Sequence, residues 1–238
     1  MKRDILDRLL AAKAASVPVA LVTDLGTGLQ SLVFDDAVHG GFGLDDERLA
    51  EVRRRLLQDR SGLLADAEDE DAPGLFVHVH APPLRLLVVG AVHIAQALAP
   101  AAALAGYAVT VIDPRGSFAT AERFPGVALN DAWPDEALAG LAIDRRTAVV
   151  TMTHDPKLDD PALLVALRSP AFYVGALGSR RTHAKRLDRL RAQGLDEVAL
   201  ARIHAPVGLD IGAVTPAEIA LSVMAQITAV RRREAAGP

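Results

Sequence analysis

Residues 84–113, with the sequence LRLLVVGAVHIAQALAPAAALAGYAVTVID, decide the fold of this chain. The segment reads as an apolar strand, a turn that begins at Gly90, a helix, a second strand and a final acidic residue, Asp113. This order is typical of the first βαβ unit of a Rossmann-like fold, which binds its ligand where the helix begins. The segment therefore predicts an α/β protein with a ligand crevice at the strand ends.

The alternation of strands and helices continues beyond this unit. The strands are apolar throughout, so we expect a mostly parallel sheet with helices on both faces. Strands are expected at residues 84–89, 108–112, 147–151 and 171–174, with a short one at 127–129. Helices are expected at residues 94–104, 134–141, 161–168 and 180–193. A last helix should follow Thr215, which forms a capping box with Glu218.

Residues 1–82 predict a separate, small α+β domain. Pro82 and Pro83 mark its end, because proline interrupts a sheet ladder and stiffens a linker. Residues 83–238 then form the Rossmann-like domain. In the small domain we expect helices at residues 4–14 and 45–60, strands at 18–22, 31–34 and 74–79, and a solvated acidic loop at 66–71.

Composition narrows the classes of partner. A net charge of −4 and a pI near 6.0 give no electrostatic reason to expect nucleic acid or an anionic membrane. Residues 1–15 carry charges inside their apolar stretch, which indicates an amphipathic helix and not a signal peptide, so we expect a cytoplasmic protein. The chain has no cysteine, which excludes thiolate metal sites and thiol or persulfide nucleophiles on this chain.

The turn at Gly90 matches the dinucleotide fingerprint G-x-G-x-x-G/A only in part. Gly90 and Ala95 take its first and last positions, but Val92 takes the second, where glycine lets the backbone approach a pyrophosphate. Asp113 stands where an NAD-binding protein holds the ribose, and Arg115 could instead bind a phosphate. Nucleotide binding and a purely structural turn both stay open.

Polar residues also follow the strand at 147–151. His154 and Asp155 stand at its carboxyl end, where they could exchange hydrogen bonds with a ligand or bind a metal. The alternative is a loop into the next helix, capped by Asp160 with Pro161 as the first helical residue. We expect the capping role for Asp160 and leave His154 open.

The segment 175–183 carries the strongest indication of an anion site. Gly175 and Gly178 permit a tight turn before a helix whose first residues are Arg180 and Arg181. Arginine is unfavourable at the positive end of a helix dipole, so an anion such as phosphate, bound near Ser179, would rationalise the pair. The alternative is an exposed pair on an amphipathic helix that also carries Lys185, Arg186, Arg189 and Arg191.

Two further pairs of residues give weaker indications of a ligand or metal site. His204 and Asp210 lie in the loop before the last helix and could contact a ligand or orient the backbone. His78 and His80 face the same side of one strand, but no third metal ligand lies near them in sequence. We expect an exposed strand edge there and no metal site.

Several segments together resemble the XdhC/CoxI family of accessory proteins, which mature molybdenum hydroxylases. The segments are VVGAVHIAQALAP (88–100), VIDPRGSFATAERFP (111–125), THDPKLDD (153–160), FYVGALGSRRTHAKRLDRL (172–190) and IHAPVGLDIGAVTPAEIALSVMAQI (203–227). The resemblance implies a cytoplasmic protein that binds molybdenum cofactor, a molybdopterin. It also implies that the protein assists sulfuration with a cysteine desulfurase and inserts the cofactor into a hydroxylase subunit such as that of xanthine dehydrogenase.

The sequence departs from the family at two positions. Val92 stands where the family has the second turn glycine, and Phe42, after Gly40 and Gly41, stands where it has a cysteine. The first departure bears on nucleotide binding, the second on direct ligation of the cofactor by this chain. We expect a short, divergent homodimeric member that works with a fuller XdhC paralogue or directly with its target.

Three hypotheses follow. The first is a non-catalytic maturation factor that binds molybdenum cofactor; the second is an NAD(P)-dependent oxidoreductase; the third is a protein adaptor that binds no small molecule. For the first, the phosphate of the pterin is expected at residues 178–181, with the histidines facing the pterin or its dithiolene. The candidate cofactor-binding residues are Gly90, Ala91, His93, Asp113, Arg115, His154, Asp155, Gly175, Gly178, Ser179, Arg180, Arg181, His204 and Asp210.

Overall fold

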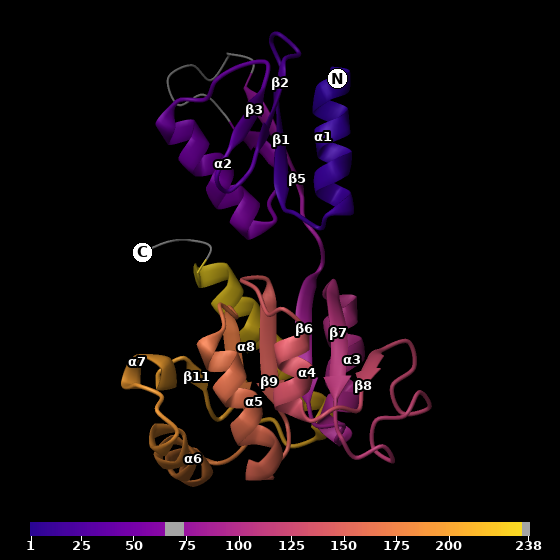
Figure 1. Cartoon of the computed structure of the whole chain (residues 1–238), viewed down its shortest axis with the longest axis vertical. Coiled ribbons are helices and arrows are strands. Elements are labelled where there is room, and N and C mark those ends of the chain that lie inside the picture. The colour runs from indigo at the N-terminus through magenta and orange to yellow at the C-terminus, as the bar shows by residue number, and fades with distance from the viewer. Residues whose placement is uncertain (65–73, 235–238) are drawn as a thin grey trace. The chain divides into compact units, whose positions relative to one another are not determined.

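The computed structural model of this chain describes residues 1–64 and 74–234, and the chain divides into two compact units. One unit contains Met1–Pro82 together with the residues from Arg232 on, and the other contains Pro83–Arg231. The acidic loop expected at 66–71 lies outside the described residues. Each unit is built around its own sheet (Figure 1).

The larger unit is a Rossmann-like α/β domain with a six-stranded sheet in the order β11-β10-β9-β6-β7-β8. All of its strand pairs are parallel. The chain order reverses between β6 and β9, which makes their carboxyl ends the topological switch point of the fold. The strands are β6 (Leu84–Val89), β7 (Tyr107–Ile112), β8 (Ala128–Asn130), β9 (Thr147–Thr151), β10 (Tyr173–Ala176) and β11 (Ile203–His204).

Helices cover both faces of this sheet, as the apolar strands predicted. Leu86, Val88 and Val150 pack against α3 and α8, while Leu87 and Val149 pack against α4, α5, α6 and α7 on the opposite face. Alternate residues of one strand therefore enter two different cores. The helices are α3 (His93–Leu104), α4 (Pro134–Gly140), α5 (Pro156–Arg168), α6 (Arg180–Ala192), α7 (Glu197–Leu200) and α8 (Pro216–Glu234).

The ends of two helices test the sequence predictions. The capping box of α8 is present, because the amide of Thr215 donates to Glu218 Oε2 at 2.8 Å and the amide of Glu218 donates to Thr215 Oγ1 at 3.3 Å. The predicted start of α5 at Pro161 is wrong, since α5 begins at Pro156 with Asp155 as its N-cap. Pro161 instead lies inside the helix.

The smaller unit holds an antiparallel sheet in the order β3-β2-β1-β5-β4. Val19 and Leu21 of β1 pack with α1, whereas Ala20 and Val22 pack with α2, so the two helices cover opposite faces (Figure 1). The elements are α1 (Arg3–Ala14), β1 (Val19–Asp24), β2 (Gln30–Val33), β3 (Val38–Gly40), α2 (Asp46–Gln58), β4 (Gly62–Leu64) and β5 (Leu75–His80).

His78 is exposed, as expected of a strand edge, and both His78 and His80 lie beyond residues 75–77 of β5, which pair with β4. The short strand β4, which the sequence did not reveal, pairs with β5 and leaves β5 between β1 and β4. The two imidazole rings are in contact, with their centroids 4.1 Å apart and their planes tilted by 40°. Across residues 1–64 and 74–234, no group of three or more His, Cys, Asp or Glu side chains is placed to hold a metal ion.

Candidate functional site

A crevice of about 350 Å³ opens at the switch point of the parallel sheet. Its walls come from the residues that follow β6, β7, β9 and β10, so four strand ends contribute to one site. We call this the switch-point crevice; the residues that line it include Val92, His93, Arg115, Thr153, His154 and Asp155.

Arg115 is held in this crevice by Asp113. Its Nε and Nη2 atoms donate to the two carboxylate oxygens of Asp113 at 2.8 and 2.7 Å. Asp113 is fully buried and also accepts from the amide of Ala91 at 2.8 Å. Burial alone would raise the pKa of Asp113, but the hydrogen bonds from Arg115 and Ala91 outweigh it and hold that pKa below its usual value.

Asp113 is occupied by structural hydrogen bonds and is not placed to hold a ribose, the role that an NAD site would give it. Both of its oxygens already accept from groups of this chain, so it orients Arg115 and the turn at Ala91. Arg115 is the half-exposed partner, with 40% of its side chain accessible, and its guanidinium lies 4.3 Å from the ring centre of Phe118. The pair therefore presents a fixed cation to the crevice.

The turn after β6 is shaped by contact with the loop after β9. Gly90 has φ +108°, and a Cβ atom there would lie 2.4 Å from Thr153 Cγ2. Val92 is the N-cap of α3, and its side chain lines the crevice. His93, the first residue of α3, is exposed beside it.

The loop after β9 places His154 at the mouth of the crevice. His154 is exposed, whereas its neighbour Asp155 caps α5 by accepting from the amide of Lys157 at 2.9 Å. The capping role expected for Asp160 is therefore wrong. Because α5 begins five residues earlier than predicted, Asp159 and Asp160 lie inside its first turns and face α6.

The segment before α6 is built as a helix start. The Ser179 hydroxyl caps α6 by accepting from the amide of Thr182 at 3.2 Å, and Arg180 and Arg181 follow it, both exposed. Gly178 has φ +134°, the left-handed region that favours glycine. Arg181 lines a second cavity next to the crevice, described below.

Three candidate residues are not among those that line the crevice: Gly175, His204 and Asp210. Gly175 is a buried packing position, since a Cβ atom there would lie 2.7 Å from Val207 Cγ2. His204 stacks on Tyr173 with ring centroids 4.7 Å apart, and burial lowers the pKa of His204. Asp210 is exposed in the loop before α8.

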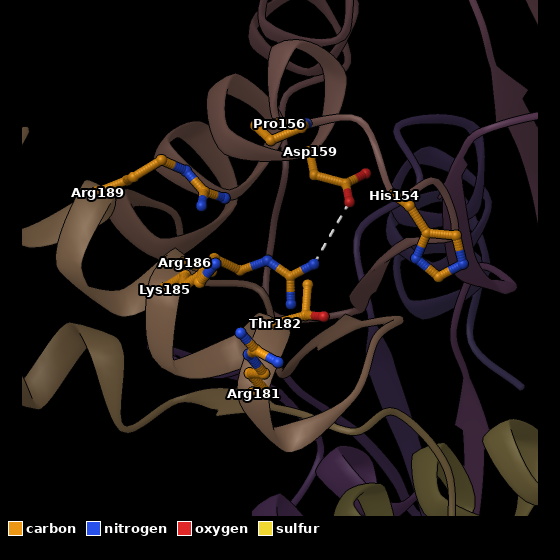
Figure 2. A pocket seen from close by; sticks show the side chains of 8 residues that line it. All are labelled: His154, Pro156, Asp159, Arg181, Thr182, Lys185, Arg186 and Arg189. Atoms are coloured by element: carbon orange, nitrogen blue, oxygen red, sulfur yellow. Dashed lines mark hydrogen bonds and ion pairs between the residues drawn. The ribbon is translucent and has the colours of Figure 1, made fainter.

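A second cavity, of about 150 Å³, lies between the beginnings of α5 and α6. We call it the cationic pocket; Figure 2 shows the residues that line it, which include Arg181, Lys185, Arg186, Arg189, Asp159 and His154. His154 lines both cavities, so the cationic pocket adjoins the switch-point crevice.

Arg186 and Asp159 form the buried centre of the cationic pocket. Arg186 Nη2 lies 3.4 Å from Asp159 Oδ2, and each side chain is 2% exposed. The Thr153 hydroxyl donates to the other oxygen of Asp159 at 2.6 Å. Burial, helped by the negative charge of Asp160, raises the pKa of Asp159 to about 6, and burial lowers the pKa of Arg186.

Sequence reasoning missed Thr153, Asp159 and Arg186. The alternative interpretation of α6 as an exposed basic helix is wrong for Arg186, which is 1% exposed. Helical spacing carried a signal, because Arg186 precedes the fully buried Leu190 by one turn and so belongs to the inward side of α6. Taken together, the two cavities offer cations and hydrogen-bond donors that suit a planar, anionic ligand.

Residues 86–227 match the family model described as the XdhC Rossmann domain. The chain is 34% identical over 209 residues to Uncharacterized protein YqeB of Escherichia coli K12, covering 83% of this chain and 39% of that protein. It is 36% identical over 150 residues to Molybdenum cofactor insertion chaperone PaoD of the same organism, covering 63% of this chain and 41% of that protein.

A solved structure matches over nearly the whole chain. The crystal structure of a xanthine dehydrogenase from Bacillus halodurans aligns with a TM-score of 0.73 and 26% identity, covering 99% of this chain and 69% of that chain. The curated relatives are longer: this chain spans about two fifths of the length of the two proteins from Escherichia coli, 39% and 41%.

Proposed function

This chain belongs to the XdhC family, and from that premise we propose that it binds molybdenum cofactor and assists the maturation of a molybdenum hydroxylase. The switch-point crevice carries this proposal, because it joins a fixed cation, Arg115, to two exposed imidazoles, His93 and His154. The name of the relative PaoD, a molybdenum cofactor insertion chaperone, supports the same ligand class.

The crevice fits a pterin that carries a phosphate. Arg115, His93 and His154 would hold the polar edge of the pterin or its dithiolene, whereas Gly90 and Ala91, both buried, would shape the turn beside them. The helix start at residues 178–181 would receive the phosphate, because exposed arginines and helix amides favour an anion there. Bound cofactor would supply the molybdenum centre that the target enzyme uses.

The geometry supports a pterin over a dinucleotide. A dinucleotide site would need the Asp113 carboxylate for the ribose hydroxyls, yet Ala91 and Arg115 already donate to both of its oxygens. The Val92 side chain also lines the crevice where a pyrophosphate would have to approach the turn. An NAD(P)-dependent oxidoreductase is therefore the weaker hypothesis.

Partners complete the proposed role. The chain has no cysteine, so any sulfur given to the cofactor must come from another protein such as a cysteine desulfurase. The cysteine position of the family is Phe42 here, and the buried Ser31 hydroxyl fixes the backbone at that residue by donating to Phe42 O at 2.8 Å. We propose that a fuller XdhC paralogue supplies the cysteine that this loop lacks before the cofactor reaches the hydroxylase subunit, or that the chain works directly with its target.

The double variant Arg180→Ala, Arg181→Ala tests the proposal. Both arginines are exposed, so the domain should stay folded while cofactor retention falls by about tenfold, the effect of losing charge-assisted hydrogen bonds. The control Arg168→Ala, Arg191→Ala removes the same charge from exposed positions of α5 and α6 and should retain cofactor normally. Equal retention by both double variants would refute the assignment of residues 178–181.

A further inference from the structure

The cationic pocket holds more positive charge than its carboxylates balance. Arg181, Lys185, Arg186 and Arg189 line it, and the acidic groups that face them from α5 are Asp159 and Asp160. Arg189 Nη2 donates to Asp160 Oδ1 at 2.9 Å, which uses one of the two carboxylates. Four cations thus share two acidic partners, and a bound anion would correct the imbalance.

The guanidinium of Arg186 is buried with donors left over. Its Nη2 atom donates to Leu177 O at 2.9 Å and lies 3.4 Å from Asp159 Oδ2. Its Nε and Nη1 atoms have no hydrogen-bond partner among the described residues, although the residue is 1% exposed. An unpaired buried donor on a charged group is costly, so this site is built to receive acceptors from a ligand.

The kind of ligand follows from the donors. Figure 2 shows the Arg186 guanidinium turned toward Asp159 and Thr182, in the interior of the pocket, while Arg181 and Lys185 come from the exposed side of α6. A planar fork of N–H groups flanked by cations matches the oxygens of phosphate. The cavity of about 150 Å³ is several times the ~30 Å³ that one water occupies in the liquid, so it has room for a small oxyanion.

We propose that the cationic pocket binds a phosphate-type oxyanion, with Arg186 as the central donor and Arg181 and Lys185 as flanking cations. Arg181 belongs both to the helix start at residues 178–181 and to the pocket. The anion is therefore either the phosphate of the bound cofactor, which would contact both, or free inorganic phosphate. Only the first source rests on the proposed function; the pocket itself is argued from its own charges and unpaired donors.

Calorimetric titration of the full chain with inorganic phosphate at low ionic strength tests the pocket directly. Wild type should bind phosphate saturably. Arg186→Lys keeps the charge but loses the planar fork of guanidinium donors. The double variant Arg181→Gln, Lys185→Gln, at two exposed positions, loses the flanking charge. Each variant should bind phosphate at least about tenfold more weakly. The matched control is Arg168→Gln, Arg191→Gln, which removes two charges from the same helices outside the pocket.

The control should bind phosphate like wild type. Absence of saturable binding by wild type, or equal affinity in wild type and the Arg181→Gln, Lys185→Gln variant, would overturn the proposal. That double variant decides the matter even where Arg186→Lys fails to fold, because both of its positions are exposed.

A second titration, with molybdenum cofactor in the presence of inorganic phosphate, separates the two sources. Competition between them supports the cofactor's own phosphate in the pocket, and simultaneous binding supports free phosphate there. Cofactor binding by a protein that binds no phosphate would overturn the pocket and leave the proposed function standing. Phosphate binding without cofactor binding would overturn the proposed function alone.

Discussion

The guanidinium of Arg186 and the carboxylate of Asp159 lie 3.4 Å apart, and each side chain is 2% exposed. The two residues come from α6 and α5, and the Thr153 hydroxyl joins them to the loop that also carries His154. A buried ion pair of this kind contributes little net stability, because desolvation offsets the attraction between the charges. The effect of this pair on stability is best measured as a function of pH, through the protonation of Asp159.

The stability of the protein should respond to Asp159 between pH 4 and pH 6. Burial raises the pKa of Asp159 to about 6 in the folded state, above its unfolded value of 3.8. The folded state therefore binds this proton more tightly, so the contribution of Asp159 is complete below about pH 4 and is lost as pH rises through 6. The shift corresponds to about 2–3 kcal/mol.

Urea denaturation of wild type and Asp159→Asn across this pH range measures that contribution. From pH 4 to pH 7, the free energy of unfolding of wild type should fall by about 2–3 kcal/mol relative to that of Asp159→Asn. Asp188→Asn, at an exposed position of α6, is the control and should track wild type. If the difference in free energy of unfolding between wild type and Asp159→Asn stays constant above pH 4, the raised pKa of the buried Asp159 carboxyl is contradicted.

Asp113 and Arg115 should both contribute to stability, and Arg115 should also bind the ligand. Asp113→Ala leaves the Ala91 amide without its buried acceptor and should cost about 1–3 kcal/mol of unfolding free energy. Arg115→Gln leaves the fully buried Asp113 carboxylate without its charged partner, so it should also cost about 1–3 kcal/mol. It should in addition weaken cofactor retention by about tenfold.

Urea denaturation and retained pterin, measured on both variants, check these expectations. Normal retention by a folded Arg115→Gln protein would show that the crevice does not use this cation.

The turn after β6 should not tolerate a side chain at Gly90. Gly90→Ala combines a positive φ with a Cβ atom 2.4 Å from Thr153 Cγ2, whereas Gly106→Ala has a positive φ and open space. We expect Gly90→Ala to cost about 2 kcal/mol more than Gly106→Ala. Adding Thr153→Ser, which removes the clashing methyl group, should restore part of the loss in denaturation experiments; equal costs for both alanine variants would contradict this contact.

The crevice could be predicted from the sequence because its polar side chains directly follow strands. An apolar strand followed by polar residues is a local pattern, so Arg115 and His154 were placed without knowledge of packing. The switch point follows from the same alternation. The order of strands then brings the ends of β6 and β9 together.

The cationic pocket could not be predicted in the same way. Pro156 and Pro161 both fit the first position of a helix. The choice decides whether Asp160 caps α5 and whether Asp159 lies inside the helix and faces α6. Arg186 is buried only because α5 presents that carboxylate to it, a pairing of residues 27 positions apart. Periodicity within α6 places Arg186 one turn before the apolar Leu190, on the inward side of the helix, but it does not identify the carboxylate that pairs with Arg186.

The most direct test of the central claim is titration of the purified chain with molybdenum cofactor, with retained pterin read after oxidation to its fluorescent form. The crevice and its cations predict near-stoichiometric retention by wild type, despite Val92 and Phe42. Absence of retained pterin in a folded protein would contradict cofactor binding and would favour an adaptor that acts through protein partners alone.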